Sequence, residues 1–317
     1  MDRLIQLLHS QPNLNFVTGA MVAVLVLATG GYVWLTWRRP TYGLAKIGAC
    51  MRFVWVMAAM LLLALAYSYK ILLIYIAFLA FQGLKEYLSI MPTRRVDRRV
   101  LFWAYLSIPF QFALIWSGWY RASLFFMPIY VFIILPTCMI IGGEMRGFLK
   151  AWSMLGWGLL SIVFSLGCLA HLLVLPATEA TPTGGLGLFF YLMLLIQLNY
   201  MTQFYFGRRF AYPKLSLKVS AIRNWASLAG SLLVIIPAAW LAAPLLTPFM
   251  MIESIMVGLL VAVGGFVGYV VLSAIKGDLQ LKDRGAMMLG RDGILNRVDA
   301  IIYTAPLYFF LVSYLYS

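Results

Sequence analysis

Several apolar runs in this sequence are long enough to cross a lipid bilayer. The runs 17–37, 154–176 and 255–275 each reach the roughly 20 apolar residues that a transmembrane helix requires. Inside hydrocarbon, backbone amides must pair within their own segment, which makes such spans helical. Charged residues form only 11% of the chain, against about 25% in soluble proteins. The alternating pattern of membrane β-strands is absent from the sequence. We therefore predict an all-α, polytopic integral membrane protein.

The apolar runs and the loops between them predict about ten spans within a single membrane domain. Residues 1–183 would hold the N-terminal transmembrane helices, and residues 184–317 a C-terminal transmembrane region with the motifs described below. The predicted spans are 14–37, 48–68, 70–90, 100–118, 122–142, 151–175, 184–206, 224–247, 251–275 and 300–316.

Lysines and arginines divide unevenly between the two ends of these spans. All but Arg3, Lys70 and Arg121 fall on one side of the predicted membrane. The positive-inside rule makes this side cytoplasmic and places both termini outside. The formal net charge of +14 is then explained by topology and by attraction to anionic lipid head groups, not by binding to nucleic acid.

Isolated polar and sulfur-bearing residues within the apolar runs are predicted to be structural. The three cysteines (Cys50, Cys138 and Cys168) lack metal-ligand or redox spacing and are expected to pack as small apolar residues. We interpret Glu253 as a capping or interfacial residue and His171 as a packed or interface residue. These interpretations weaken the hypothesis that the chain is a transporter or channel.

The densest group of charges lies just before the last apolar segment. Nine charged side chains fall between Lys276 and Asp299. Tyr269, Ser273 and Lys276 follow one another at steps of four and three, and would share one helix face that leads into this stretch. Gly264 and Gly268, four apart, predict close packing between helices.

Two readings of this charged stretch follow from its chemistry. Lysine and arginine neutralise phosphate oxygens, and carboxylates hold the divalent cations that bridge phosphates, so the stretch suits a phosphate site at a membrane surface. A solvated loop of mixed ion pairs is the alternative. Asn296 and Asp299 would share a face at the start of the last helix, with Asp292 one turn earlier.

Residues 273–299, "SAIKGDLQLKDRGAMMLGRDGILNRVD", resemble the signature of the CDP-diacylglycerol synthases, the phosphatidate cytidylyltransferases, without a gap. Residues 199–225 resemble a second motif region of that family, and "LKEYL" (84–88) an early element. The signature positions that match are Ser273, Ile275, Lys276, Lys282, Asp283, Gly285, Gly293, Ile294, Arg297, Val298 and Asp299, and in the second region Asn199, Gly207, Arg208, Ser220 and Trp225.

The resemblance implies a membrane enzyme that joins CTP to phosphatidate, giving CDP-diacylglycerol and diphosphate with a divalent cation such as Mg²⁺. Phosphatidate or another anionic phospholipid would be the membrane partner, and a bacterial inner membrane the location. The sequence is compatible with a homodimer. The implied catalytic residues are Ser273, Lys276, Arg297 and Asp299; the phosphate-binding residues are Asn199, Arg208, Arg223, Lys282 and Arg291; the metal-site residues are Asp283, Asp292, Asn296 and Asp299.

The sequence departs from this family at the metal site. Three aspartates bind the cation in the family, and this chain has Tyr269 and Asn296 at two of those positions and keeps only Asp299. Losing two negative charges would slow the reaction on the order of 10³-fold or more, unless Asp292 or Asp278 compensates. Two hypotheses follow: an active cytidylyltransferase with an altered metal site, or a non-catalytic relative that binds lipid or nucleotide and acts as a partner or regulator in lipid synthesis.

Overall fold

A computed structural model describes residues 69–91, 98–141, 147–175, 184–209, 224–278 and 295–316, together with Gly30 and Trp55. Every regular element within these ranges is helical. In chain order the elements are α4 (Tyr69–Ile90), α5 (Arg98–Trp116), α6 (Tyr120–Ile129), η1 (Tyr130–Ile134), α7 (Leu135–Ile141), α8 (Phe148–Gly158), η2 (Leu159–Phe164), α9 (Ser165–Val174), α10 (Gly184–Arg209), α11 (Trp225–Leu246), α12 (Met251–Asp278) and α13 (Leu295–Tyr316).

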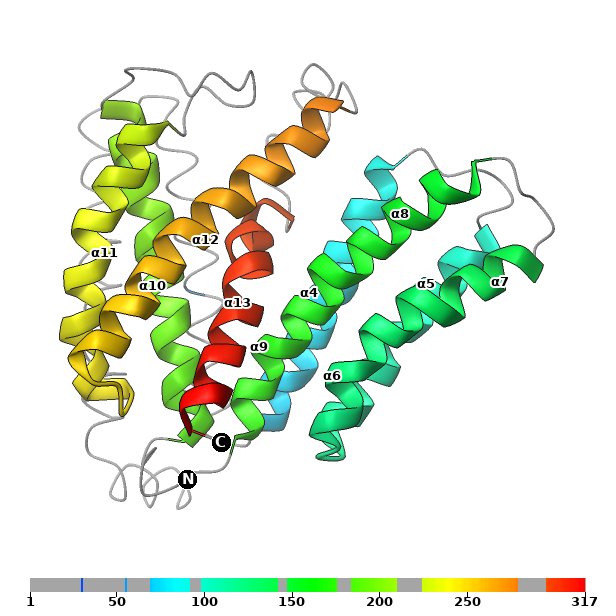
Figure 1. Cartoon of the computed structure of the whole chain (residues 1–317), viewed down its shortest axis with the longest axis horizontal. Coiled ribbons are helices and arrows are strands. Elements are labelled where there is room, and N and C mark those ends of the chain that lie inside the picture. Colours follow the sequence, from blue (N-terminus) through cyan, green and yellow to red (C-terminus); the bar gives the residue numbers. More distant parts are fainter. Residues whose placement is uncertain are drawn as a thin grey trace.

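The helices run back and forth across one bundle (Figure 1). The π-helical segments η1 and η2 join α6 to α7 and α8 to α9 into continuous rods. Helix α12 packs against α10, α11 and α13, and α10 also packs against α11 and α13. Helix α13 also packs against α9, and α4 lies against α5, α8 and α9. We call one end of this bundle the α13-start end: α4, α7, α10 and α12 end there, and α5, α8, α11 and α13 begin there.

Seven of the described helices are long and apolar enough to cross a membrane. The apolar part of α5, Val100–Trp116, is shorter than these seven. This confirms the prediction of an all-α, polytopic membrane protein. The helices coincide closely with the predicted spans from 70–90 onward. Apart from Gly30 and Trp55, the first two predicted spans, 14–37 and 48–68, lie outside the described residues, so the total of ten stays a prediction.

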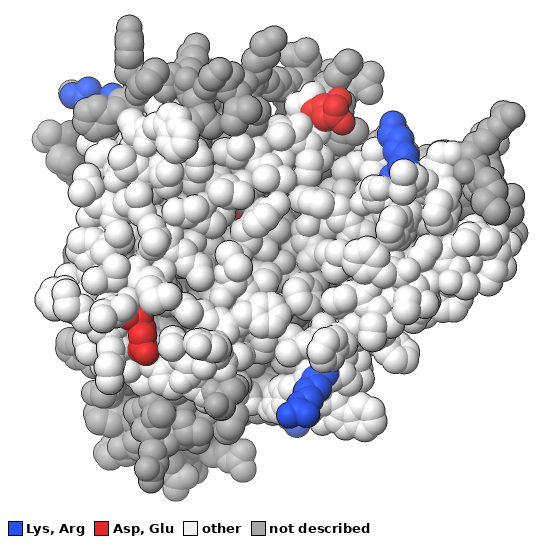
Figure 2. Space-filling model, in the orientation of Figure 1, with Lys and Arg blue, Asp and Glu red and all other residues white. Residues whose placement is uncertain are grey.

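The outer surface of the bundle is apolar, as contact with lipid requires. Phe102, Phe125 and Leu233 expose 63%, 65% and 76% of their surface. In the view of Figure 2, charged side chains gather toward the two ends, and the band between them is almost free of charge. Such a band matches a hydrocarbon layer bounded by two polar interfaces.

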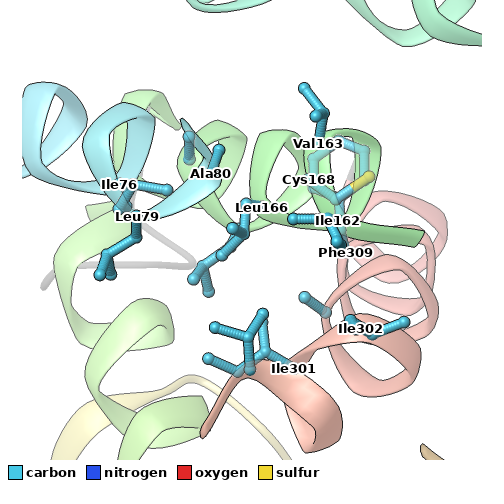
Figure 3. Packing of buried hydrophobic residues seen from close by; sticks show 14 of the residues in the cluster. Ile76, Leu79, Ala80, Ile162, Val163, Leu166, Cys168, Ile301, Ile302 and Phe309 are labelled. Atoms are coloured by element: carbon cyan, nitrogen blue, oxygen red, sulfur yellow. The ribbon is translucent and has the colours of Figure 1, made fainter. Parts of the chain in front are cut away.

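A shared apolar core joins the two halves of the described chain. Figure 3 shows Ile76 and Leu79 of α4, Leu166 of α9, and Ile301 and Ile302 of α13 packed together. Because lipid is as apolar as these side chains, tight packing and hydrogen bonds between helices hold such a core, not exclusion from water. The Ser165 hydroxyl provides one of these bonds by donating to the Ile302 carbonyl oxygen at 2.7 Å.

Two glycines allow α12 and α13 to approach each other closely. A Cβ atom at Gly264 would lie 2.9 Å from the Thr304 Cγ2 atom. At Gly268 it would collide with the backbone carbonyl oxygen of Asp299. The expected close packing at Gly264 and Gly268 is therefore confirmed, and α13 is the helix that uses it.

The residues predicted to be structural behave so where they are described. The Glu253 Oε2 atom accepts a hydrogen bond from the Met250 backbone N–H at 2.8 Å and another from the Tyr316 hydroxyl at 2.9 Å. His171 is buried, with its Nε2 atom 2.7 Å from the Ser123 Oγ atom. Cys168 lies in the apolar core and Cys138 is half-buried, both as free thiols, whereas Cys50 lies outside the described residues.

The arrangement predicts which charged residues share a membrane face. Lys85 and Lys150 are exposed at the α13-start end, and Lys70 and Arg121 are exposed at the opposite end. In a cysteine-free background, single cysteines at the first pair should react with an impermeant maleimide from one side of the membrane only, and those at the second pair from the other side only. The positive-inside rule predicts that the side that labels the first pair is the cytoplasmic one. Labelling of both pairs from the same side would contradict the fold.

The contact at Gly268 predicts that an added methyl group destabilises the protein at this position of α12 but not at a position of α12 without a close neighbour. Gly268→Ala should lower the melting temperature in detergent, because forced overpacking typically costs about 1–3 kcal/mol. Gly277→Ala is the matched control, since nothing lies within 4 Å of the added atom. It should change stability by no more than about 1 kcal/mol. Equal melting temperatures for the two variants would show that α12 and α13 are not in contact at Gly268.

Candidate functional site

The candidate site lies where the end of α12 meets the start of α13. Tyr269, Ser273 and Lys276 occupy the last turns of α12, and all three are half-buried. Leu272, between them in sequence, is buried. The predicted shared face therefore leads a hydroxyl group and a lysine toward the α13-start end, where a polar ligand from water could reach them.

Asp299 is the buried acidic residue of this junction. Its side chain lies one turn inside α13 and is only 2% exposed. The Oδ1 atom accepts a hydrogen bond from the backbone N–H of Ala300 at 2.6 Å. A carboxylate is costly to bury in a membrane protein, and such residues usually serve ion or substrate sites. The close approach of Gly268 fixes the backbone that carries this carboxylate.

Asn199 connects α10 to α12 directly beside this junction. Its side-chain Nδ2 atom donates to the Val261 carbonyl oxygen at 2.8 Å. Its Oδ1 atom accepts from the Gln203 Nε2 atom at 2.9 Å. A Cβ atom at Gly265 would collide with the Asn199 amide and would lie 3.6 Å from the Ala300 Cβ atom. The glycine thus makes room for the Asn199 side chain next to α13.

Gln203 completes this polar connection, and the sequence interpretation did not include it. Its Nε2 atom also donates to the Ala262 carbonyl oxygen at 3.0 Å and lies 3.5 Å from the Ser231 hydroxyl of α11. Three helices are thereby joined at one side-chain amide. The sequence signal that could have identified Gln203 is its spacing from Asn199. Gln203 lies four residues after Asn199 and so one helical turn further along α10.

Glu86 is a second residue of this region that was missed. Its Oε2 atom accepts a hydrogen bond from the backbone N–H of Leu295, the first residue of α13, at 3.0 Å. The carboxylate thus satisfies one of the backbone donors that a helix N-terminus leaves open. Glu86 is part of the "LKEYL" segment, which resembles an early element of the synthases, and that resemblance assigns the residue no role.

Asn224 begins α11 and follows the predicted phosphate-binding Arg223. Its Oδ1 atom accepts from the Ser227 backbone N–H at 2.9 Å, and the Ser227 hydroxyl lies 3.2 Å from the Asn224 backbone nitrogen. This reciprocal cap fixes the direction in which the chain enters α11. Arg223 itself lies outside the described residues.

The predicted site residues fall into three groups. Asn199, Ser273, Lys276 and Asp299 are described in full, and Asn199 and Asp299 both lie beside the Gly265–Gly268 segment of α12. Three more have described backbone positions on helices but no described side chains: Arg208 on α10, and Asn296 and Arg297 on α13. The remainder lie outside the described residues: Arg223, Lys282, Asp283, Arg291 and Asp292.

The described side chains do not by themselves form a binding site for a divalent cation. Among them, no three histidine, cysteine, aspartate or glutamate residues cluster closely enough to hold a metal ion. Of the described residues, Asp299 alone offers a buried carboxylate at the junction, and one of its oxygen atoms already accepts a hydrogen bond. Mg²⁺ sites usually combine one or two carboxylates with waters and substrate phosphates. Of the other predicted metal-site residues, Asn296 has no described side chain, and Asp283 and Asp292 lie outside the described residues.

Comparison with known proteins places this chain in a family. A profile of the cytidylyltransferase family matches residues 49–315. The uncharacterized protein YnbB of Escherichia coli K12 is 32% identical over 294 residues, covering 93% of this chain and 96% of that protein.

Shorter parts of the chain are similar to proteins that are named for a reaction. The phosphatidate cytidylyltransferase of Synechocystis sp. is 37% identical over 83 residues, covering 26% of this chain and 27% of that protein. The phosphatidate cytidylyltransferase of Bacillus subtilis is 28% identical over 132 residues, covering 41% of this chain and 48% of that protein. The match over most of the chain, with the junction of α12 and α13 inside it, shows that this protein belongs to the cytidylyltransferase family.

Proposed function

We propose that this protein transfers the cytidylyl group of CTP to phosphatidate, giving CDP-diacylglycerol for phospholipid synthesis. The observation that carries the proposal is the buried Asp299 carboxylate at the junction of α12 and α13, on the helix that follows the half-buried Ser273 and Lys276. A buried acidic residue at a helix junction that also carries a lysine and a hydroxyl group suits a phosphate site better than a loop of solvated ion pairs.

The reaction needs positioning and charge stabilisation more than covalent chemistry from the protein. A phosphate oxygen of phosphatidate would form a bond to the α-phosphorus of CTP, and the bond from that phosphorus to the bridging oxygen would break and release diphosphate. Lys276 would stabilise the phosphate oxygens, and the Ser273 hydroxyl would donate a hydrogen bond to them. Arg297, Arg223, Lys282 and Arg291 are the further cationic residues that we assign to phosphate binding.

A divalent cation would supply positive charge that offsets the negative charge of the phosphates. We propose that Mg²⁺ is held by Asp299 together with Asn296, Asp283 and Asp292, because the described donors alone are too few. The proposed location is a bacterial inner membrane, with CTP entering from the cytoplasm at the α13-start end and phosphatidate from the surrounding leaflet. The clustering of Lys85, Lys150 and Arg209 at that end supports this orientation.

A second candidate function is non-catalytic binding of an anionic lipid or nucleotide. It is favoured by Tyr269 and Asn296, which stand where the resembling synthases have aspartates. Such a protein would keep the cationic residues that bind phosphate. It would lack the negative charge that holds a catalytic cation. It would act as a partner or regulator of lipid synthesis.

Two substitutions test the enzymatic proposal. Purified protein given CTP, phosphatidate and Mg²⁺ or Mn²⁺ should form CDP-diacylglycerol. Asp299→Asn and Lys276→Met should each lower kcat/KM by about 10²-fold or more, as expected when a charge that stabilises the transition state is removed. Lys150→Met, an exposed lysine at the same end of the bundle, is the matched control and should retain full activity. Full activity of Asp299→Asn would exclude the proposed role of this carboxylate.

A restoration experiment separates the two candidate functions. If the wild-type protein binds lipid but forms no product, Tyr269→Asp combined with Asn296→Asp should restore measurable turnover, since each adds a carboxylate ligand for the cation. If the wild-type protein is active, the same double variant should mainly lower the concentration of Mg²⁺ required. If neither the wild-type protein nor the double variant forms product or binds lipid, both candidate functions are excluded.

A further inference from the structure

The carboxylate of Glu86 reaches from the N-terminal half of the chain to the helix that carries Asp299. The Oε2 atom of Glu86 lies 3.0 Å from the Leu295 backbone nitrogen, although the two residues are 209 positions apart in the sequence. Leu295 is itself buried, with 1% of its surface exposed. Its N–H therefore needs a partner within the protein, and a carboxylate next to the positive end of a helix is a favourable one.

The residue after Glu86 holds α4 in place at this level. The Tyr87 hydroxyl donates to the Met154 carbonyl oxygen of α8 at 3.0 Å. Its ring packs against Gly158, where an added Cβ would collide with it, and lies 5.3 Å from the Trp157 ring centroid. Glu86 thus projects from a backbone that is fixed against α8, so it can serve as a rigid reference point for α13.

The start of α13 has little freedom to move without disturbing the site. Asp299 follows Leu295 by four residues, about 6 Å along the helix axis. Its carbonyl oxygen is in close contact with Gly268, so a shift of α13 would change the place of the carboxylate relative to Ser273 and Lys276. The Glu86 bond and the Gly268 contact together fix the first turns of α13 from two different helices.

We propose that Glu86 is a positioning residue for the candidate site: its hydrogen bond to the Leu295 N–H holds the first turn of α13 so that Asp299 keeps its place beside Gly268 of α12. This proposal rests on the proposed function for its effect on turnover. The role requires an acceptor atom at the end of the side chain and does not require a negative charge. Glu86→Gln therefore keeps the contact, and Glu86→Ala removes it.

Hydrogen exchange tests the contact without relying on turnover. In detergent, Glu86→Ala should raise amide exchange in peptides covering 295–302 by about tenfold or more, and Glu86→Gln should leave it within about threefold of wild type. Exchange in α10 should stay unchanged, which excludes global unfolding. Lys85→Ala, an exposed neighbour on α4, is the matched control and should behave as wild type. Unchanged exchange in Glu86→Ala would overturn the proposal even if the protein is an active synthase.

Kinetics then separates positioning from direct binding of a cation. Glu86→Ala should lower kcat about 10- to 100-fold, since small misplacements of catalytic groups have effects of this size, and Glu86→Gln should recover most of the rate. If Glu86→Gln is as slow as Glu86→Ala and requires more Mg²⁺, Glu86 is a metal ligand and the positioning role is overturned. If the wild-type protein forms no CDP-lipid, the proposed function fails, and the exchange measurement still decides whether Glu86 positions α13.

Discussion

The close contact between α12 and α13 is the constraint on which the candidate site depends. Gly264 and Gly268 bring the two backbones together, and at Gly268 the neighbour is the carbonyl of Asp299 itself. In lipid, where apolar side chains gain little from leaving the solvent, such close packing is a main source of helix association. The same glycines therefore stabilise the bundle and set the position of its buried acidic residue.

Polar side chains reinforce this contact from both sides. Asn199 and Gln203 bond to carbonyl oxygens of α12 and tie it to α10, whereas Glu86 bonds to the start of α13 and ties it to α4. Each such group would be costly in hydrocarbon without a partner. Their placement around one junction gives a rigid frame to the backbone that carries Asp299. A site for phosphate chemistry gains from such a frame, since preorganised charges act without rearrangement during the reaction.

The sequence predicted the features that depend on local pattern. The apolar runs fixed the helices from residue 70 onward to within a few positions, and the Gly264–Gly268 spacing predicted close packing. The Glu253 cap could be foreseen because its partner Met250 lies three residues away. The Glu86–Leu295 bond could not, because it joins residues that only the tertiary fold brings together. The partner helix of Gly268 and the role of Asn199 as a bridge also depend on the arrangement of α10, α12 and α13.

The most direct test of this account is an experimental structure of the protein with CTP and Mg²⁺, or with phosphatidate, in a lipid nanodisc. The account predicts phosphate density at the junction of α12 and α13, in contact with Ser273 and Lys276 and close to the Asp299 carboxylate. Phosphate bound elsewhere on the protein, or an empty junction at saturating ligand, would contradict it.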